Sequence, residues 1–141
     1  MELAGALDIA RGQKKGVLVT ERRDGRPQLS NIMFVVGDDD VIRISVTADR
    51  AKTKNLERNA RCSLYVGRDD FWAYLVLDAD AELSPVAQDP NDATVAELVE
   101  QYRGMQGEHP NWDEFRQAMI DDRRQVARLR PTHAYGTWPD A

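Results

Sequence analysis

Three cations lie where an apolar, β-type segment gives way to a helix-forming one. Arg50, Lys52 and Lys54 follow the Val- and Ile-rich segment 41–47 and fall in or near the first turn of the helix expected over 49–59. Cations at a helix N-terminus are unfavourable, because that end already carries partial positive charge. A bound anion turns this cost into attraction, since backbone N–H groups, the helix dipole and the cations then converge on it.

The same helix start offers further polar groups. Thr47 or Asp49 is the expected N-cap, and the hydroxyl of Thr53 could add a donor toward an anion. This segment therefore favours a phosphate site. The alternative is an exposed basic helix that binds no ligand.

Uncharged polar side chains mark a second candidate segment, residues 26–31. On an extended strand Gln28 and Ser30 share one face, and Leu29 and Asn31 share the other. Amide and hydroxyl groups supply both donors and acceptors, which suits the edge of a flat ring rich in heteroatoms. The alternative is the solvent-facing side of an antiparallel strand, which needs no ligand.

Other candidates carry less information. Trp72 and Tyr74 are expected to share a strand face and could stack on a planar ligand, although such aromatics also serve as core or dimer contacts. His133 is isolated and is interpreted as a structural histidine. Cys62 reads as a buried small apolar residue. Glu108-His109 and the cluster 121–124 read as surface features.

Several kinds of site have no support. The chain contains no Gly-x-Gly-x-x-Gly and no Gly-x-Ser-x-Gly motif, so a Rossmann dinucleotide site and a nucleophile elbow are not predicted. Cys62 is the single cysteine, and His109 and His133 are the two histidines. An internal disulfide is thus excluded, and neither a cysteine-based zinc site nor a His-rich metal site is expected.

Charge is distributed unevenly along the chain. The formal net charge is −5, which argues against a nucleic-acid binder that relies on a general positive field. Residues 11–61 nevertheless hold twelve Lys and Arg against seven Asp and Glu, a local net of +5. This concentration is compatible with a small anion bound there, or with solvated surface charges alone.

The expected elements form an α+β chain that is mainly β. The 141 residues fit one domain, 1–141. The order of the expected elements predicts a small antiparallel barrel of about six strands with flanking helices, because tight hairpins join consecutive strands, the first of them marked by Asp24-Gly25. Alternation over 41–47 places Val41, Arg43, Ser45 and Thr47 on one face and Ile42, Ile44 and Val46 on the other. No stretch approaches a membrane span and the start lacks a signal-peptide run, so we expect a cytoplasmic protein. The expected elements are helices near 3–10 and 49–59, strands at 16–20, 28–36, 41–47, 61–66 and 71–81, a helical pair starting near 89 and 112 whose second member reaches Val126, a break at Pro131, and a short strand over 132–138.

Two of these segments resemble a known family. Residues 25–31 and 50–56 are similar to the split β-barrel flavin and deazaflavin oxidoreductases, typified by pyridoxamine 5′-phosphate oxidase. The similarity is greatest to the actinobacterial branch that uses the deazaflavin coenzyme F420. Shorter similarities keep the family order along nearly the whole chain: Trp72, Tyr74, 107–109, 112–113, 115–119, 122–124 and 133–136.

The resemblance implies a homodimer with two cofactor sites at the subunit interface. The cofactor phosphate would be held by the run from Arg50 through Ala51, Lys52 and Thr53 to Asn55. The tricyclic ring would lie beside Gln28, Ser30, Asn31 and Met33. The facing subunit would supply Trp72, Tyr74 and His133.

The function expected from the resemblance is hydride transfer from coenzyme F420 to a small conjugated organic acceptor. No general acid is evident, so protonation would come from solvent. One alternative is an oxidoreductase that uses flavin mononucleotide (FMN) on the same fold. The long charged tail of F420 distinguishes the two, and Lys15, Lys54 and Arg58 could form its basic exit path. Another alternative is a carrier that binds F420 without turnover.

Overall fold

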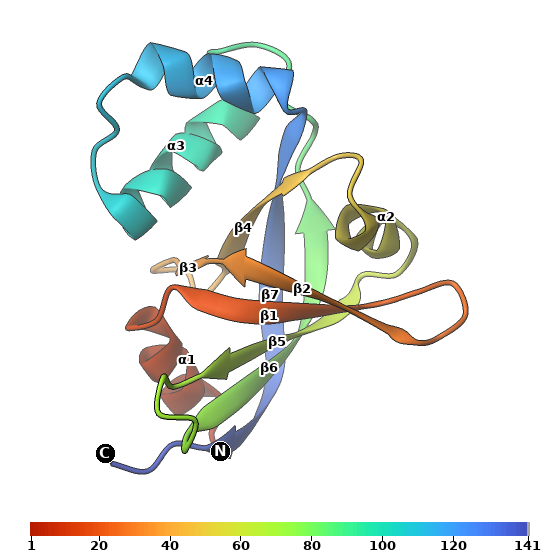
Figure 1. The fold of residues 1–141 in the computed structure, drawn as a ribbon, viewed down its shortest axis with the longest axis vertical. Helices are drawn as coiled ribbons and strands as arrows, with labels where there is room; N and C mark the ends of the chain where they lie inside the picture. Colours follow the sequence, from red (N-terminus) through yellow and green to blue (C-terminus); the bar gives the residue numbers. More distant parts are fainter. Residues whose placement is uncertain (141) are drawn as a thin grey trace.

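A computed structural model describes residues 1–140 of the chain (Figure 1). The helices are α1 (Leu3–Arg11), α2 (Ala51–Arg58), α3 (Ala93–Gln106) and α4 (Trp112–Asp121). The strands are β1 (Lys15–Glu21), β2 (Pro27–Met33), β3 (Val35–Val36), β4 (Ile42–Thr47), β5 (Arg61–Gly67), β6 (Tyr74–Leu83) and β7 (Arg124–Thr137). Over the described residues the chain is therefore α+β and mainly β, as predicted, with one strand more than expected.

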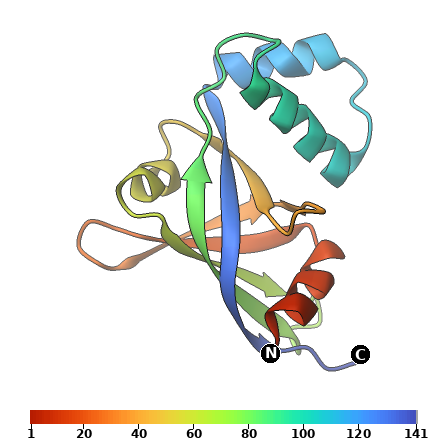
Figure 2. The same ribbon diagram turned by 180° about the vertical axis from the view of Figure 1, so that it is seen from behind.

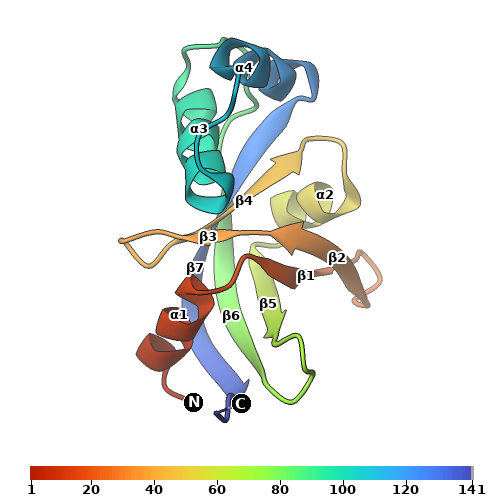
Figure 3. The ribbon, with the colours of Figure 1, turned by 60° about the vertical axis from the view of Figure 1, so that its left-hand side comes forward.

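The strands form one antiparallel sheet in the order β2-β1-β5-β6-β7-β4-β3. The sheet curls into a half-barrel, so that Met33 of β2 and Ser45 of β4 line the same pocket. Figures 1 and 2 show α1 beside both chain ends at one end of the barrel, and α3 and α4 at the opposite end. Figure 3 shows α2 beside the β1–β2 hairpin. None of the helices described is long and apolar enough to cross a membrane.

Alternation along β4 fixes which of its faces turns inward. Ile42, Ile44 and Val46 are buried, whereas Arg43 and Ser45 lie on the other, partly open face. This confirms the predicted faces within β4, whereas Val41, predicted on the face of Arg43, precedes the strand and is buried. The barrel core also takes in the buried face of α1 and inward residues of the other strands: Ala6, Leu7, Ala10, Leu18, Phe34, Leu64, Val66, Leu75, Leu77, Ala127 and Leu129.

The predicted N-terminal helix and the first hairpin are confirmed. Gly12 lies directly after α1. Gly25 sits in the β1–β2 turn with φ of +84°, a left-handed conformation that glycine adopts without steric cost. The Arg22 N–H donates to Arg26 O at 2.9 Å and closes the turn. The Asp24-Gly25 pair therefore marks the hairpin correctly.

The end of the chain differs from the prediction. A single 14-residue strand, β7, replaces the expected break at Pro131 and the short strand 132–138, and Val126 lies in this strand instead of a helix. The pairing of β7 with β6 shifts register between Asp78 and Ala79, opposite Pro131. The extra residue is Thr132, which lies between the pairs Asp78–His133 and Ala79–Pro131, and proline is tolerated next to such a bulge.

Two other strand boundaries were also wrong. The expected strand 28–36 is divided into β2 and β3 at Phe34, whose side chain is buried and whose N–H donates to Lys14 O at 2.9 Å. The expected strand 71–81 begins only at Tyr74. Trp72 precedes it in a turn, where Phe71 has φ of +68°, so Trp72 and Tyr74 do not share a strand face.

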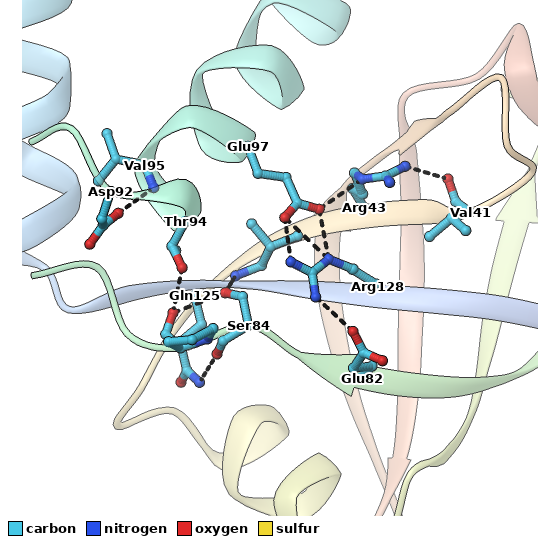
Figure 4. A network of polar contacts seen from close by, with 12 residues as sticks. Val41, Arg43, Glu82, Ser84, Asp92, Thr94, Val95, Glu97, Gln125 and Arg128 are labelled. Carbon is cyan, nitrogen blue, oxygen red and sulfur yellow. Dashed lines mark hydrogen bonds and ion pairs between the residues drawn. The ribbon is translucent and has the colours of Figure 1, made fainter.

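A network of charged side chains attaches α3 to the barrel (Figure 4). Glu97 of α3 accepts hydrogen bonds from Arg43 Nε of β4 at 2.8 Å and from Arg128 Nη2 of β7 at 2.5 Å. Arg128 also donates to Glu82 of β6 at 2.7 Å. One carboxylate thus joins the helix to two adjacent strands.

Candidate functional site

The N-terminus of α2 leaves backbone donors free. Arg50 is the N-cap, with φ of −76° and ψ of 152°, and no side chain caps the helix, so the predicted caps Thr47 and Asp49 are wrong. The first-turn N–H groups of Ala51, Lys52 and Thr53 precede the first intrahelical bond, which Lys54 N–H makes to Arg50 O. Uncapped amides beside cations form a corner suited to an anion.

The side chain of Thr53 turns inward at this corner. It is fully buried, and its hydroxyl donates to Thr47 O at 2.7 Å. This bond joins the helix start to the end of β4. The hydroxyl proton is thereby engaged, so the contribution left to Thr53 toward an anion is its backbone N–H.

Lys52 is a partly buried cation. It makes no hydrogen bond or ion pair with residues 1–140, and its pKa lies below the usual value because of burial and then the charges of Arg50 and Arg124. Burial and like charges both disfavour the ammonium form. A bound anion would offset both effects, because a nearby opposite charge favours the ammonium form.

A pocket of about 340 Å³, here called the basic pocket, lies between this corner and the α3–α4 pair. Its cations are Lys52 and Arg124, and the lining found among the described residues includes no carboxylate. The lining residues are Asn31, Ile32, Met33, Ser45, Lys52, Gln101, Tyr102, Met105, Phe115, Met119 and Arg124. Asn31, Met33 and Lys52, all predicted from the sequence, are thus brought together.

The guanidinium of Arg124 makes few polar contacts. Nη1 lies 3.4 Å from Ser45 Oγ, a long hydrogen bond. Nε is buried without a hydrogen-bond partner in the described chain and lies 3.6 Å from Asp122 Oδ2. The sequence placed Arg124 among surface features, whereas it is half-buried and lines the basic pocket.

Aromatic side chains form the opposite wall of the basic pocket. The rings of Tyr102 and Phe115 are 5.1 Å apart in an edge-to-face arrangement. Trp112 and His109 pack against Tyr102 at 5.8 and 5.2 Å. His109 is therefore half-buried in this cluster, which corrects its reading as a surface residue, while Glu108 is exposed and accepts from Trp112 Nε1 at 2.9 Å.

Gln28, Ser30 and Asn55 belong to a polar chain between α2 and the β1–β2 hairpin. Asn55 Nδ2 donates to Thr20 Oγ1 at 3.1 Å, and that hydroxyl donates to Gln28 Oε1 at 3.1 Å. Gln28 Nε2 donates in turn to Ser30 Oγ at 2.9 Å. The chain holds β2 at a fixed position relative to the anion corner.

A second hollow, here called the outer pocket, opens on the outer face of the sheet. Its volume is about 520 Å³, and Val17, Tyr65 and Phe71 make much of its lining apolar. Asn31 and Met33 line the outer pocket as well as the basic pocket. The end of β2 therefore separates two neighbouring cavities.

Three predicted residues lie away from the basic pocket within one chain. Trp72 is 79% exposed, and Tyr74 stacks on Tyr65 with ring centroids 5.9 Å apart. His133 lines a third hollow, of about 540 Å³, together with Ser63 and Asp78. The described part of the chain holds no group of three or more His, Cys, Asp or Glu arranged to bind a metal.

Comparison with known proteins identifies the family. A family model described as pyridoxamine 5′-phosphate oxidase matches residues 6–138. The chain belongs to the pyridoxamine 5′-phosphate oxidase family. This confirms the resemblance noted in the sequence, and the fold of this family binds flavin-type cofactors.

Solved structures with this fold differ in what they do. An F420 reductase superposes with a TM-score of 0.63 at 26% identity, over 86% of this chain and 89% of that one. A conserved hypothetical protein of Mycobacterium tuberculosis superposes with a TM-score of 0.75 at 19% identity, over 96% of this chain and 84% of that one. A haem storage protein of Vibrio cholerae superposes with a TM-score of 0.68 at 19% identity, over 96% of this chain and 94% of that one. The two structures at 19% identity show only that this chain shares their fold.

The family's cofactor class fits the residues present. The uncapped start of α2 offers backbone donors to an anion, and β2 offers amide and hydroxyl groups beside it. Sequence reasoning missed Ser45, Arg124 and the wall from α3 and α4. Alternation in 41–47 places Ser45 on the open face, but Arg124 was hidden by the wrong boundary between the last helix and β7.

Proposed function

We propose that this chain binds coenzyme F420 and transfers hydride from it to a small conjugated organic acceptor. The observation that carries the proposal is the corner at the start of α2. Uncapped amides and two cations, Arg50 and Lys52, meet there beside the polar residues of β2. The 26% identity with an F420 reductase over 86% of the chain supports the same assignment.

Each residue has a role that follows from its position. Arg50, Lys52 and the first-turn N–H groups bind the cofactor phosphate, and Asn55 with Thr53 holds this helix start in place through buried hydrogen bonds. Gln28, Ser30, Asn31 and Met33 border the ring on β2. When bound, F420 supplies the hydride chemistry, and the protein supplies position and electrostatics.

We further propose that the protein is a homodimer. Large apolar side chains stand exposed: Leu29, Met33, Phe71, Trp72, Tyr74 and Tyr135. Leu29, Met33, Tyr74 and Tyr135 lie on the outer face of the sheet, as their pairing registers require. Exposed apolar patches of this kind mark interaction surfaces, and a second copy covering this one would bring its own Trp72, Tyr74 and His133 toward the cofactor. Light scattering during gel filtration should give twice the mass of one chain, and a monomer at micromolar concentration would contradict it.

FMN remains the alternative cofactor, because the family's fold binds flavin-type molecules. The proposal is tested by titrating the apoprotein with F420 and with FMN, following the fluorescence of each. We expect F420 to bind at micromolar concentrations. Binding of FMN in this range without binding of F420 would overturn the choice of cofactor. Oxidation of reduced F420 by a quinone in the presence of the protein separates an enzyme from a carrier, which would bind F420 but give no turnover.

A further inference from the structure

We propose that the basic pocket holds the acceptor and that this acceptor is a planar aromatic molecule carrying a carboxylate. The inference rests on the proposed function, since it names the substrate class of that site. It is carried by the pairing of one underused cation, Arg124, with an aromatic wall across a pocket that already borders the cofactor-binding residues.

The guanidinium of Arg124 has fewer hydrogen-bond partners than those of Arg43 and Arg128. Arg43 and Arg128 both donate to Glu97 at 3.1 Å or less. Arg124 has one long bond to Ser45 and a loose ion pair of 3.6 Å between its Nε and Asp122 Oδ2, and this Nε has no hydrogen-bond acceptor in the described chain. A guanidinium has five N–H donors in a planar fork that matches a carboxylate. Donors of this guanidinium therefore remain unfilled, and Arg124 lines a pocket whose described lining includes Lys52 but no acid.

The opposite wall suits a flat ring. Tyr102, Phe115, Met105 and Met119 line it. The apolar residues of α4 are only partly buried: they pack on the small core cluster of Ala87, Val95 and Val99, and Phe115 and Met119 among them also line the pocket. Aromatic and thioether groups pack well against aromatic ligands. A volume of about 340 Å³ is near the lower end of ligand pockets, roughly 300–1,000 Å³, and suits one or two fused rings.

The pocket also lies where hydride transfer requires the acceptor. Asn31 and Met33, which border the cofactor ring in the proposed function, form one edge of the basic pocket, and Lys52 forms another. A ring held between Phe115 and this edge would lie next to the reduced cofactor. Reduction adds one hydride from the cofactor and one proton from solvent across a conjugated double bond, and the carboxylate on Arg124 remains unchanged.

The test compares two forms of one probe, the uncharged 2-naphthamide and the negatively charged 2-naphthoate. Their binding to the full-length protein is measured by calorimetry, with and without saturating F420. We expect wild-type protein to bind 2-naphthoate at least tenfold more tightly than 2-naphthamide. Arg124→Gln should remove this preference while leaving the affinities for 2-naphthamide and F420 within twofold. Arg130→Gln changes an exposed arginine of the same strand and should behave as wild type.

A second variant tests the aromatic wall. Phe115→Ala should weaken both probes together, by about tenfold. Equal affinity of wild-type protein for the two probes would overturn the inference, and so would a tenfold loss of F420 affinity in Arg124→Gln, which would assign the pocket to the cofactor. If wild-type protein binds neither F420 nor FMN but keeps an Arg124-dependent preference for the carboxylate, the redox function fails and carboxylate recognition stands.

Discussion

The side-chain amide of Asn55 on α2 donates a 3.1 Å hydrogen bond to the hydroxyl of Thr20 on β1, and both side chains are buried. The Asn55 carbonyl oxygen accepts from Arg58 Nη2 at 3.0 Å. Both polar ends of the side chain are therefore used inside the protein. Asn55 contributes to the cofactor corner by fixing the helix that carries Arg50 and Lys52.

Replacing Asn55 with leucine should lower the free energy of unfolding by about 1–3 kcal/mol. The reason is that the buried Thr20 oxygen still donates to Gln28 but loses the donor it accepted from, and a buried acceptor left without a donor costs about this much. Urea unfolding followed by tryptophan fluorescence measures the change. Lys54→Ala, on the exposed side of the same helix, should stay within about 0.5 kcal/mol of wild type. Equal stability of the two variants would show that the buried bond contributes little.

Glu97→Gln should also destabilise the protein, by about 1–3 kcal/mol, because two arginines lose a shared, partly buried carboxylate. Arg128 keeps Glu82 and Arg43 keeps Asp39, which limits the loss. The matched control is Glu100→Gln on the same helix. Its side chain is 69% exposed and pairs with Arg103, so the expected loss is below about 1 kcal/mol. A Glu97 variant as stable as this control would remove the network as the anchor of α3.

Stability should fall as the solution is acidified. Hydrogen bonds from Arg128 and Arg43 hold the pKa of Glu97 below its ordinary value, and those from Arg43 lower the pKa of Asp39 to about 2. The folded state then binds fewer protons than the unfolded chain, so this stabilisation is complete above the ordinary carboxyl pKa and is lost as pH falls toward 2. The difference in unfolding free energy between wild type and Glu97→Gln should therefore shrink between pH 5 and pH 3. A constant difference across that range would contradict the lowered pKa of Glu97.

Lys52→Ala should weaken cofactor binding by about 1.5–3 kcal/mol, the contribution of a charged hydrogen bond, or roughly tenfold to more than a hundredfold in Kd. F420 fluorescence titration measures it. Arg130→Ala removes the same charge from an exposed position outside the pocket and should change the Kd by less than twofold. Unchanged affinity in Lys52→Ala would exclude Lys52 from the cofactor site.

Local sequence signals predicted most of the fold. Alternation fixed the inward face of β4, and Asp24-Gly25 marked the first hairpin, because both signals depend on neighbouring residues alone. The failures involve tertiary contacts. Pro131 indicates a break locally, yet β7 continues through it with a bulge at the neighbouring Thr132. Phe34 reads as part of a strand, yet its burial divides β2 from β3.

In the candidate site too, residues close together in the sequence were predicted, whereas a residue brought in by strand pairing was missed. The cations Arg50 and Lys52 were found because they are adjacent in sequence and unusual at a helix start. Arg124 follows 72 residues after Lys52 and meets it only because β7 pairs with β4, placing Thr47 opposite Arg124. No local pattern encodes that pairing, so the second cation of the basic pocket needed the structure.

Cys62 should be unreactive in the folded protein. Burial, followed by the charges of Asp80 and Asp78, raises the pKa of its thiol to about 12, so little thiolate exists at neutral pH. We expect a disulfide reagent at pH 8 to label native protein about a hundredfold or more slowly than protein in guanidinium chloride, since both access and thiolate are lacking. Denatured protein should release one equivalent per chain, which controls for prior oxidation. Because Cys62 pairs with Ala79, any slow native labelling reports separation of β5 from β6, and its rate should rise with urea. Labelling of native protein as fast as that of denatured protein would show that this strand pair does not protect the thiol.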